Sequence, residues 1–439
     1  MKAVLSNRIL LELSKEDALR VTETLTYKLP ALHAKAKPEK IKNIIKVREG
    51  LYSIPAGRED LIPEGYEIID KRCSCAANIP KMDITLRENQ QEIVDNLEGN
   101  SIILAKVGFG KTIVSLAVAN KLQLKTLIVV HNLMLRDQWC DEIKRLMNFT
   151  PSIIGSGKLE YDKSITVANV QTLTKYAQQL KDEFGLVIVD EAHKVPSTTF
   201  TNIIDNLRAK VKIGLTGTLA RKDKKDMFIP DYFSTTSIFE PPRENTLVPK
   251  VYIIETNIPF SFNPNKSGAY AEEMTKLVRN PDYLRLCFYL CSLYQDKNHQ
   301  VLFVADRTEV FKVLHADLPD YGVITGQTSK EERDEITRKI YSKELSGILG
   351  TLSIFKEGIS INPLSCLILG TPISGKNLPM LEQLIGRVCR QYEGKKQPII
   401  LDINLKGGVA KNQALERQNY YYEMNYNIQK FTLDIGEQL

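Results

Sequence analysis

The stretch that most restricts how this chain can fold is residues 105–112, AKVGFGKT, which follow the apolar run 101–104 and precede the helix-forming run 113–119. Glycines in a strand–turn–helix unit let successive backbone N–H groups point at one phosphate, and the helix N-terminus adds its dipole. Lys111 would then reach the β- and γ-phosphates, and Thr112 would offer its hydroxyl to Mg²⁺. The loop residues expected around the phosphates are Lys106, Val107, Gly108, Phe109 and Gly110.

A second motif, Asp-Glu-Ala-His at 190–193, ends the apolar run 185–189. Open α/β sheets bind their ligands at the carboxyl ends of the strands, where these two carboxylates would lie. Asp190 would hold Mg²⁺ through water, and Glu191 would polarise the attacking water. Taken alone, the first motif could be a Gly-rich turn that binds no ligand, since Ala105 stands where the motif usually has glycine. The second motif alone could be a strand end whose carboxylates are only solvated. Together, in this order, they predict a nucleotide-hydrolysing site.

Composition sets wider limits. The 439 residues are enough for about three domains of about 150 residues each. A net charge of +6 permits a nucleic-acid partner without arguing for one. The seven scattered cysteines argue against a disulfide framework and for a reducing compartment. No apolar run reaches about 18 residues and the N-terminus has no apolar leader, so we expect neither export nor a membrane span.

Strand-like runs alternate with helical ones in two successive series, which indicates right-handed βαβ units and two parallel sheets. The first series has strands at 101–104, 126–130, 164–168, 186–189 and 212–215, and the second at 301–305, 322–325, 348–351, 366–369 and 398–402. We therefore expect an α/β protein with two tandem parallel-sheet domains. The expected parts are a small N-terminal α+β domain at 1–82, a first α/β domain at 83–240, a linker at 241–250, a second α/β domain at 251–406 and a helical tail at 407–439.

The second series carries an arginine pair in residues 383–390, QLIGRVCR. If this segment is helical throughout, Arg387 and Arg390 lie one turn apart on one face. Two arginines so placed could enter the phosphate site of a neighbouring domain. Alternatively, they are partners in surface ion pairs.

The ordered set of motifs resembles that of the superfamily-two helicases over residues 84–405. The matching segments are an adenine-reading element at 86–90, motif I at 105–112, motif Ia at 130–139, motif Ic at 168–173, motif II at 190–193, motif III at 215–218, motif IV at 301–307, motif V at 351–360 and motif VI at 383–390. The sequence departs from the common pattern at His131, where proline is usual, at Gly217, where alanine is usual, and at Ser360, where aspartate is often found.

This resemblance implies two RecA-like domains that use ATP and Mg²⁺. It makes Lys111, Glu191, Arg387 and Arg390 the catalytic residues, and Thr112 and Asp190 the metal-holding ones. The further nucleotide contacts that it implies are Arg87, Gln90, His193, Gly358 and Gln383, beside the loop 106–110 and Asp190. The implied contacts to DNA phosphates are Gln171, Thr172, Arg307 and Thr351.

Within the superfamily, the LxxQW form of motif Ia and the short N-terminal domain are similar to the phage branch-migration helicases of the UvsW kind, among them a coliphage member of very similar length. The resemblance implies an ATP-dependent DNA helicase or translocase that acts on forked or branched DNA in recombination and replication. It also implies a cytoplasmic location, the host cytoplasm if the protein is phage-encoded, and no membrane partner.

Three alternatives stay open at this stage. The first is an RNA helicase or remodeller, although the PTRELA and SAT motifs usual in DEAD-box proteins are not found in the sequence. The second is a binding protein that keeps the fold without activity, against which Glu191, Arg387 and Arg390 argue. The third is the motor subunit of a restriction system, although no PD-(D/E)xK-like nuclease segment is seen.

A motor that contacts only phosphates cannot distinguish branched DNA from a linear duplex, so branch preference needs an additional binding surface. The lysine-rich stretch from Lys35 to Arg48, including Lys37, Lys40 and Lys42, is the first candidate, although such a run is more often a solvated face. The segment 228–251, with its prolines and aromatic residues, is a second place for a strand-separating hairpin.

Overall fold

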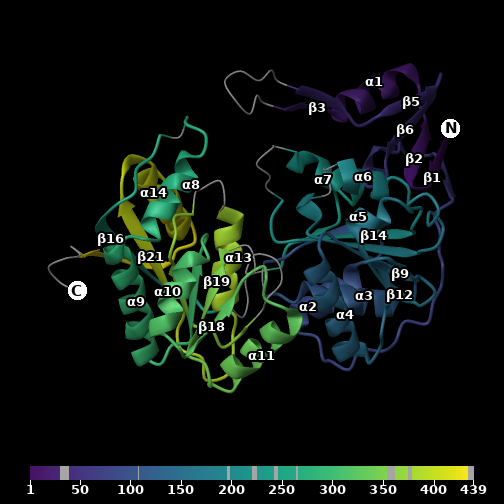
Figure 1. Ribbon diagram of the computed structural model, residues 1–439. Coiled ribbons are helices and arrows are strands. Elements are labelled where there is room, and N and C mark those ends of the chain that lie inside the picture. Colours follow the sequence, from purple (N-terminus) through teal and green to yellow (C-terminus); the bar gives the residue numbers. More distant parts are fainter. Residues whose placement is uncertain are drawn as a thin grey trace. The chain divides into compact units, whose positions relative to one another are not determined.

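The computed structural model describes residues 1–29, 39–106, 108–194, 198–219, 225–241, 246–263, 265–352, 361–373 and 378–433, without the side chains of 198, 199 and 379. The chain divides into two compact units, Met1–Arg243 and Glu244–Leu439, which Figure 1 shows. The division falls inside the segment 241–250 that the sequence marks as a linker. Val107, Gly358, Lys35 and Lys37 lie outside the described residues.

The first unit is built on an eight-stranded sheet. Its strands, in spatial order, are β11 (Lys158–Leu159), β10 (Ser152–Gly155), β12 (Ile165–Asn169), β9 (Thr126–Val130), β13 (Leu186–Asp190), β14 (Val211–Thr216), β8 (Ser101–Leu104) and β15 (Ile238–Phe239). All neighbours pair in parallel except β10 and β11. The central strands are buried on both faces, which is why they appear in the sequence as uninterrupted apolar runs.

Helices cover this sheet, and the sequence gives several of them clear start signals. Helix α4 begins after Asn132, whose side-chain oxygen accepts a hydrogen bond from the Leu135 N–H at 2.7 Å. The helices of this sheet are α2 (Glu88–Asn96), α3 (Lys111–Leu122), α4 (Leu133–Met147), α5 (Val170–Leu173), α6 (Thr198–Ile204) and α7 (Ile229–Tyr232), with 3₁₀ turns η2 (Ala192–Lys194) and η3 (Asp226–Phe228).

Residues 1–82 form their own five-stranded sheet within the first unit. Its order is β5 (Ile45–Arg48), β6 (Leu51–Pro55), β2 (Arg8–Glu12), β1 (Lys2–Leu5) and β7 (Glu67–Asp70). Helix α1 (Lys15–Thr24) packs on it and is capped by Ser14, whose hydroxyl accepts from the Asp17 N–H at 3.0 Å. A separate hairpin pairs β3 (Thr26–Leu29) with β4 (Glu39–Lys42).

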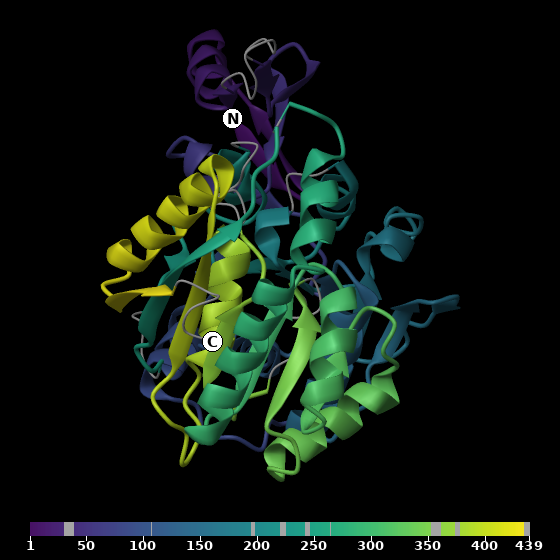
Figure 2. The ribbon, with the colours of Figure 1, turned by 60° about the vertical axis from the view of Figure 1, so that its left-hand side comes forward.

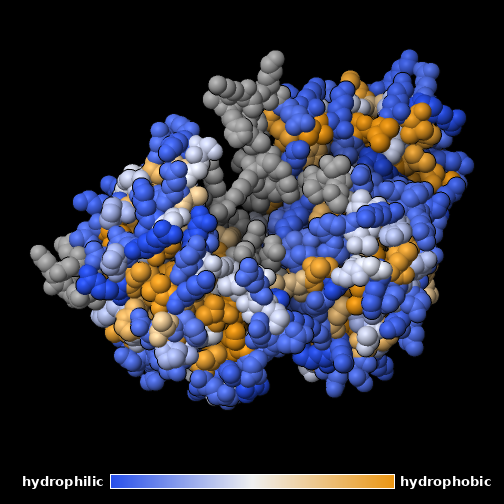
Figure 3. Space-filling model, viewed as in Figure 1, coloured by the Kyte–Doolittle hydropathy of each residue, from blue (hydrophilic) through white to orange (hydrophobic). Residues whose placement is uncertain are grey.

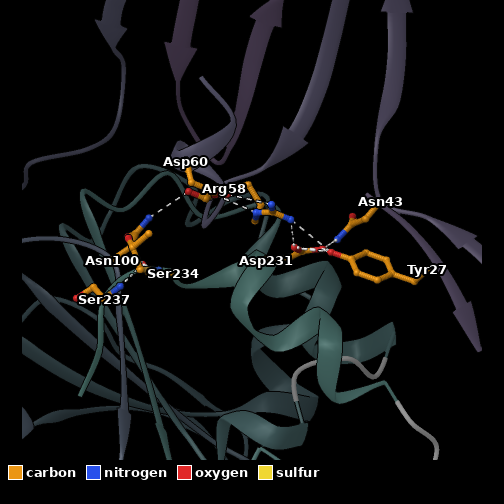
Figure 4. Close-up of polar contacts among 10 residues, drawn as sticks. Tyr27, Asn43, Arg58, Asp60, Asn100, Asp231, Ser234 and Ser237 are labelled. Carbon is orange, nitrogen blue, oxygen red and sulfur yellow. Dashed lines mark hydrogen bonds and ion pairs between the residues drawn. The ribbon is translucent and has the colours of Figure 1, made fainter. Parts of the chain in front are cut away.

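A buried carboxylate joins this N-terminal part to the large sheet (Figure 4). Asp231 of α7 accepts hydrogen bonds from the Tyr27 hydroxyl at 2.9 Å and from the Asn43 amide at 2.7 Å. Arg58 places one guanidinium nitrogen 3.2 Å from Asp231 and pairs through the others with Asp60 at 2.9 and 3.0 Å. Burial raises the pKa of the Asp231 carboxyl, so these donors are what keeps the charged form in place.

The contact continues into the backbone and into apolar packing. The Gly57 N–H donates to the Asp231 carbonyl at 2.8 Å, and a Cβ at Gly57 would lie 2.4 Å from the Pro230 carbonyl oxygen, so only glycine allows this approach. Tyr27 meets the ring of Phe228 edge-on at 4.5 Å between centroids. Leu29 is buried in the same cluster.

The suggestion of a hairpin in residues 228–251 is wrong for the part that is described. Phe228, Tyr232 and Phe233 are buried in the core, and the segment forms η3, α7 and the short parallel strand β15. The aromatic residues that indicated a wedge are instead core residues, and they support the N-terminal domain.

The second unit holds one seven-stranded sheet, entirely parallel. Its order is β18 (Tyr321–Ile324), β19 (Gly347–Thr351), β17 (Val301–Ala305), β20 (Cys366–Leu369), β21 (Ile399–Lys406), β16 (Lys250–Pro259) and β22 (Asn427–Leu433). Its described helices are α8 (Ala269–Leu277), α9 (Pro281–Asp296), α10 (Glu309–Asp317), α11 (Lys330–Tyr341), α13 (Leu378–Val388) and α14 (Gly408–Glu423). The expectation of two parallel-sheet α/β domains is confirmed.

The segment 407–439 is more than a helical tail. Helix α14, yellow in Figure 2, is followed by β22, an edge strand that the sequence analysis did not expect. Buried polar contacts fix the helix, because the Arg417 guanidinium pairs with Asp402 of β21 at 2.7 Å and donates to the Ile373 carbonyl at 2.8 Å. The Tyr421 hydroxyl adds a bond to the same carboxylate at 2.9 Å.

Figure 3 shows a surface that is mostly hydrophilic, with apolar patches that include the N-terminal domain at the upper right. Exposed large apolar side chains of that domain are Met1, Leu19, Ile45, Val47 and Ile68. Within the part of the chain that the structure describes, no helix has both the length and the apolar character needed to cross a membrane.

We expect Asp231→Ala to lower the free energy of unfolding of the first unit by about 3 kcal/mol, because it leaves Tyr27, Asn43 and Arg58 buried without their shared acceptor. Urea denaturation measures the change. Glu335→Ala, which breaks an exposed ion pair with Arg338 in the second unit, is the control and should have little effect. Equal small effects of both substitutions would show that the docking does not depend on this carboxylate.

Candidate nucleotide and nucleic-acid site

Strand register brings the motifs of the first unit to one edge of its sheet. Leu104 is paired with Thr216, and Leu215 with Asp190, so β8, β14 and β13 end side by side. On the other side of β13, Val130 is paired with Asn169, the last residues of β9 and β12. The segments that follow these five strand ends are the ones that resemble motifs I, III, II, Ia and Ic.

The two described glycines of the phosphate loop adopt a backbone conformation that favours glycine. Gly108 and Gly110 have φ of +93° and +91°, and a Cβ at Gly110 would lie 2.7 Å from the Gln90 side-chain nitrogen. Helix α3 begins directly after Gly110, at Lys111, and Thr112 follows in its first turn. The Lys111 ammonium lies back over the loop and donates to the Ala105 carbonyl at 2.7 Å. A helix N-terminus directly after a glycine-containing loop, with a lysine beside it, fits a nucleotide polyphosphate.

Arg87 and Gln90, expected to read adenine, are tied to this loop. The Gln90 side chain donates to the Phe109 carbonyl at 2.7 Å, and the Arg87 guanidinium donates to the same oxygen. Gln90 also accepts from the Arg87 backbone N–H at 3.1 Å, which caps α2. The Arg87 guanidinium lies 5.5 Å from the centroid of the Phe109 ring. If these residues bound a base, any shift in their side chains would change the hydrogen bonds that they make to the phosphate loop.

Asp190 is held in place by two donors. Its Oδ1 accepts from the Glu191 backbone N–H at 2.9 Å and its Oδ2 from the Trp139 indole N–H at 2.9 Å. Burial and the nearby Glu191 raise the pKa of the Asp190 carboxyl, and the Trp139 bond and the Lys111 charge oppose that shift. A buried carboxylate of this kind is stabilised when a cation lies beside it, which fits a divalent metal at this edge.

Glu191 has a backbone that few residues adopt. Its φ of +55° is left-handed, a conformation that costs a residue with a Cβ free energy. Its carboxylate lies 3.2 Å from His193 Nδ1, which in turn lies 3.1 Å from the Thr216 hydroxyl. That hydroxyl donates to the Thr218 carbonyl at 2.6 Å. Motifs II and III are thus joined by side-chain contacts.

The candidate nucleic-acid loops of the first unit are also connected. The Gln171 amide donates to the His131 carbonyl at 3.3 Å, and the Gln171 N–H donates to the Asn169 side chain at 3.1 Å. His131 Nε2 lies 2.6 Å from the ammonium group of Lys194, the residue directly after motif II. Thr172 lies beside Gln171 in the short helix α5. Lys194 carried no signal in the sequence beyond its place after motif II.

In the second unit, Ala305 and Thr351 are paired across β17 and β19, which brings Thr351 near the segment that holds Arg307. Among the described residues, the Arg307 Nε atom is buried without a hydrogen-bond partner. Gln383 and Arg387 lie on α13, where Arg387 is 9% exposed.

One expectation for motif VI is wrong. Arg390 is not on the helix with Arg387, because α13 ends at Val388. The backbone of Arg390 forms an isolated antiparallel bridge with Thr246, and the Cys389 carbonyl accepts from the Leu247 N–H at 2.8 Å. Pairing with the segment before β16 therefore ends the helix, although the apolar spacing of the sequence would allow another turn.

Sequence similarity to known proteins covers nearly the whole chain. Residues 83–221 match the family "Type III restriction enzyme, res subunit", and residues 285–391 match "Helicase conserved C-terminal domain". "Probable helicase D10" of Escherichia phage T5 is 38% identical over 429 residues, which cover 96% of this chain and 94% of that protein. "Putative ATP-dependent RNA helicase L396" of Acanthamoeba polyphaga mimivirus is 28% identical over 79% of this chain and 69% of that one.

A third relative, "DNA 3'-5' translocase XPB2" of Sulfurisphaera tokodaii, is 26% identical over 74% of this chain and 83% of its own. The solved structure of Saccharomyces cerevisiae Dbp5 bound to RNA and ADP BeF3 covers 80% of this chain and 90% of its own, with a TM-score of 0.57 and 12% identity. At that identity the likeness concerns the fold.

Two tandem RecA-like units, with a phosphate loop and an acidic motif at the strand ends of the first, are the arrangement of a helicase-type ATPase. The chain belongs to the superfamily-two helicases, as the sequence predicts, and it is an ATP-hydrolysing helicase.

We expect Lys111→Ala to abolish ATP hydrolysis, because it removes the main side-chain charge from the phosphate loop. Glu191→Gln should keep ATP binding and stop turnover, because it removes the proposed water-polarising carboxylate. Steady-state hydrolysis and equilibrium binding of a fluorescent ATP analogue measure the two effects, with Lys158→Ala on the exposed strand β11 as control. Normal turnover by the Glu191 variant with nucleic acid present would refute its role.

Proposed function

We propose that this helicase is an ATP- and Mg²⁺-dependent translocase on DNA that acts at forked or branched structures, as in branch migration and junction remodelling. The proposal is carried mainly by one surface of the first unit, the outer face of the β3–β4 hairpin. It is supported also by the form of motif Ia and by the connected loops at the edge of the large sheet.

The hairpin has two unlike faces. Tyr27, Leu29 and Ile41 pack on the core of the first unit. The other face carries Lys28, Lys40 and Lys42, all exposed. Lys28 lies directly opposite Lys40 across the two strands, and like charges so placed destabilise a hairpin. An anionic partner such as a nucleic-acid backbone removes that repulsion.

The β3–β4 hairpin is firmly attached, so DNA bound to its lysine face would keep a fixed position relative to the ATP-binding residues. Because Asp231, Arg58 and Gly57 hold the N-terminal domain against the large sheet of the first unit, the hairpin would move together with the phosphate loop and motif II. A duplex or a second DNA arm bound there would keep its position on this unit during the ATP cycle. A basic surface of this kind recognises backbone position and not base sequence, as a branch-specific enzyme requires.

For the ATPase step, Lys111 would hold the β- and γ-phosphates, and Thr112 and Asp190 would hold Mg²⁺. Bound Mg²⁺ would neutralise charge on the phosphate oxygens. Glu191 would orient the attacking water and accept its proton, with His193 positioning the carboxylate. Arg387 and Arg390 would supply positive charge to the transferred phosphoryl group. Gln171, Thr172, Arg307 and Thr351 would contact phosphates of the DNA.

RNA is the alternative substrate, and the relatives point both ways, since one is named an RNA helicase and another a DNA translocase. DNA is favoured because motif Ia has the LxxQW form and motif III reads Leu-Thr-Gly-Thr, where DEAD-box RNA helicases usually have PTRELA and SAT. A restriction motor would share the same ATPase and would differ by its nuclease.

ATP hydrolysis measured with single-stranded, linear duplex, forked and four-way DNA, and with RNA, tests the proposal. We expect forked and four-way DNA to stimulate most. Replacing Lys28, Lys40 and Lys42 together by Gln should weaken DNA binding, lower the salt dependence by about 0.9 log unit per lost phosphate contact and reduce the preference for forks.

The matched control replaces three exposed lysines of the second unit, Lys266, Lys276 and Lys312, and should leave the fork preference unchanged. Stimulation by RNA above all DNA forms would overturn the DNA assignment. An unchanged fork preference in the hairpin variant would show that branch selection lies elsewhere in the motor.

Arg387→Ala and Arg390→Ala should each fold normally and lose nucleic-acid-stimulated hydrolysis by about 10³-fold or more, the scale of an arginine that stabilises a phosphoryl-transfer transition state. Binding of ATP should change much less. Arg338→Ala on the exposed face of α11 is the control, and thermal unfolding checks that each variant folds. Retention of stimulated turnover in both motif VI variants would rule out this role.

A further inference from the structure

Trp139 is the single tryptophan of the chain, and its side chain contacts Asp190 although it belongs to the core. It is 3% exposed and packs in the apolar cluster that includes Ile143, Leu146 and Val130. Its indole N–H is a donor without acceptor capacity, and it donates to Asp190 Oδ2 at 2.9 Å. The sequence marks Trp139 as part of motif Ia but gives it no chemical role.

This bond completes the fixation of the Asp190 carboxylate. The Glu191 N–H engages Oδ1 from the same stretch of backbone, whereas the Trp139 N–H engages Oδ2 from another helix. One donor on each oxygen sets the plane of the carboxylate and leaves further lone pairs for a metal-bound water. Groups that orient a metal-holding side chain in this way commonly change metal affinity when they are removed.

Helix α4 connects this donor to the candidate nucleic-acid loops. The helix begins after Asn132, next to His131, which contacts both Gln171 and Lys194. Trp139 lies about two turns further along the same rigid element. A shift of α4 caused by a nucleic acid at the His131 loop would therefore move the indole relative to Asp190.

We propose that Trp139 is a positioning residue for Asp190, which holds the carboxylate in the orientation that organises Mg²⁺ and links that orientation to occupancy of the motif Ia loop. The inference rests on the proposed role of Asp190 in holding the metal. If Trp139 only filled the core, replacing it would not change how ATP binding depends on the Mg²⁺ concentration.

The test uses the full-length chain with Trp139→Phe, which keeps an aromatic ring in the core and removes the N–H. We expect the Mg²⁺ concentration that half-saturates binding of a fluorescent, non-hydrolysable ATP analogue to rise about 10-fold or more. Stimulation of ATP hydrolysis by DNA should fall as well, and raised Mg²⁺ should restore the basal rate.

Ile143→Ala is the matched control, because it truncates a fully buried side chain one turn along the same helix without touching Asp190. It should lower thermal stability and leave the Mg²⁺ dependence unchanged. If the Phe variant and this control shift the Mg²⁺ dependence equally, Trp139 acts only through packing and the proposal is wrong.

Asp190→Asn distinguishes the role of Asp190 in holding Mg²⁺ from the role of Trp139 in positioning Asp190. If it hydrolyses ATP with normal Mg²⁺ dependence, the proposed role of Asp190 fails. If it loses activity while Trp139→Phe behaves as the native protein, only the positioning role fails.

Because the chain has one tryptophan, biosynthetic replacement changes this position alone. Benzothienylalanine keeps the bicyclic shape and lacks the N–H, so it should reproduce the Phe variant even if that variant folds poorly. Fluorotryptophan keeps the N–H and should behave as the native protein. Tryptophan emission should also respond to Mg²⁺ with the ATP analogue, and no response together with an unchanged Mg²⁺ requirement in the benzothienylalanine protein would overturn the inference.

Discussion

The parallel register of β8, β14, β13, β9 and β12 is the constraint on which the rest of the first unit depends. Every pairing in this set ends within a residue or two of its neighbour, so the chain leaves five strands at one edge. A shift of one residue in any pair would also exchange the two faces of a strand that is buried on both sides. The apolar run of each strand therefore fixes the position of the polar residue that follows it. Sheet pairing thus brings the segments that hold Lys111 and Asp190 to the same edge of the sheet.

The sequence predicts this part well because its signals are local. A strand-like run followed by Gly-Lys-Thr or Asp-Glu carries its own geometry, and the strands at 101–104, 301–305 and 366–369 are found at the predicted bounds. The cap of α1 at Ser14 is equally local. The same logic fails at Arg390, because what ends α13 is pairing with Thr246, a residue far away in the chain.

Long-range polar contacts are the features that the sequence could not reveal. Asp231, Arg58 and Tyr27 lie in segments with unremarkable local patterns, yet they form the buried joint between the N-terminal domain and the large sheet. Trp139 and Asp190 meet across the sheet edge for the same reason. Arg417 and Asp402 form a comparable pair under α14. In each case a buried charge or donor finds its hydrogen-bond partner only in the tertiary fold, so the local hydrophobic pattern of the sequence does not predict the contact.

The place of β22 in its sheet bears on how the second unit is made. Strand β16 comes first in that unit, yet it lies between β21 and β22, the last two strands of the sheet to be synthesised. Until those strands leave the ribosome, β16 has neither of its neighbours, and its row of unpaired N–H and C=O groups is open to other chains. The first unit has the same arrangement, since β8 lies between β14 and β15, the last two strands of its sheet, but that sheet is complete before the second unit begins. The sheet that carries the phosphate loop can therefore pair completely while the second unit is still being translated, whereas β16 stays without neighbours until the end of the chain is made.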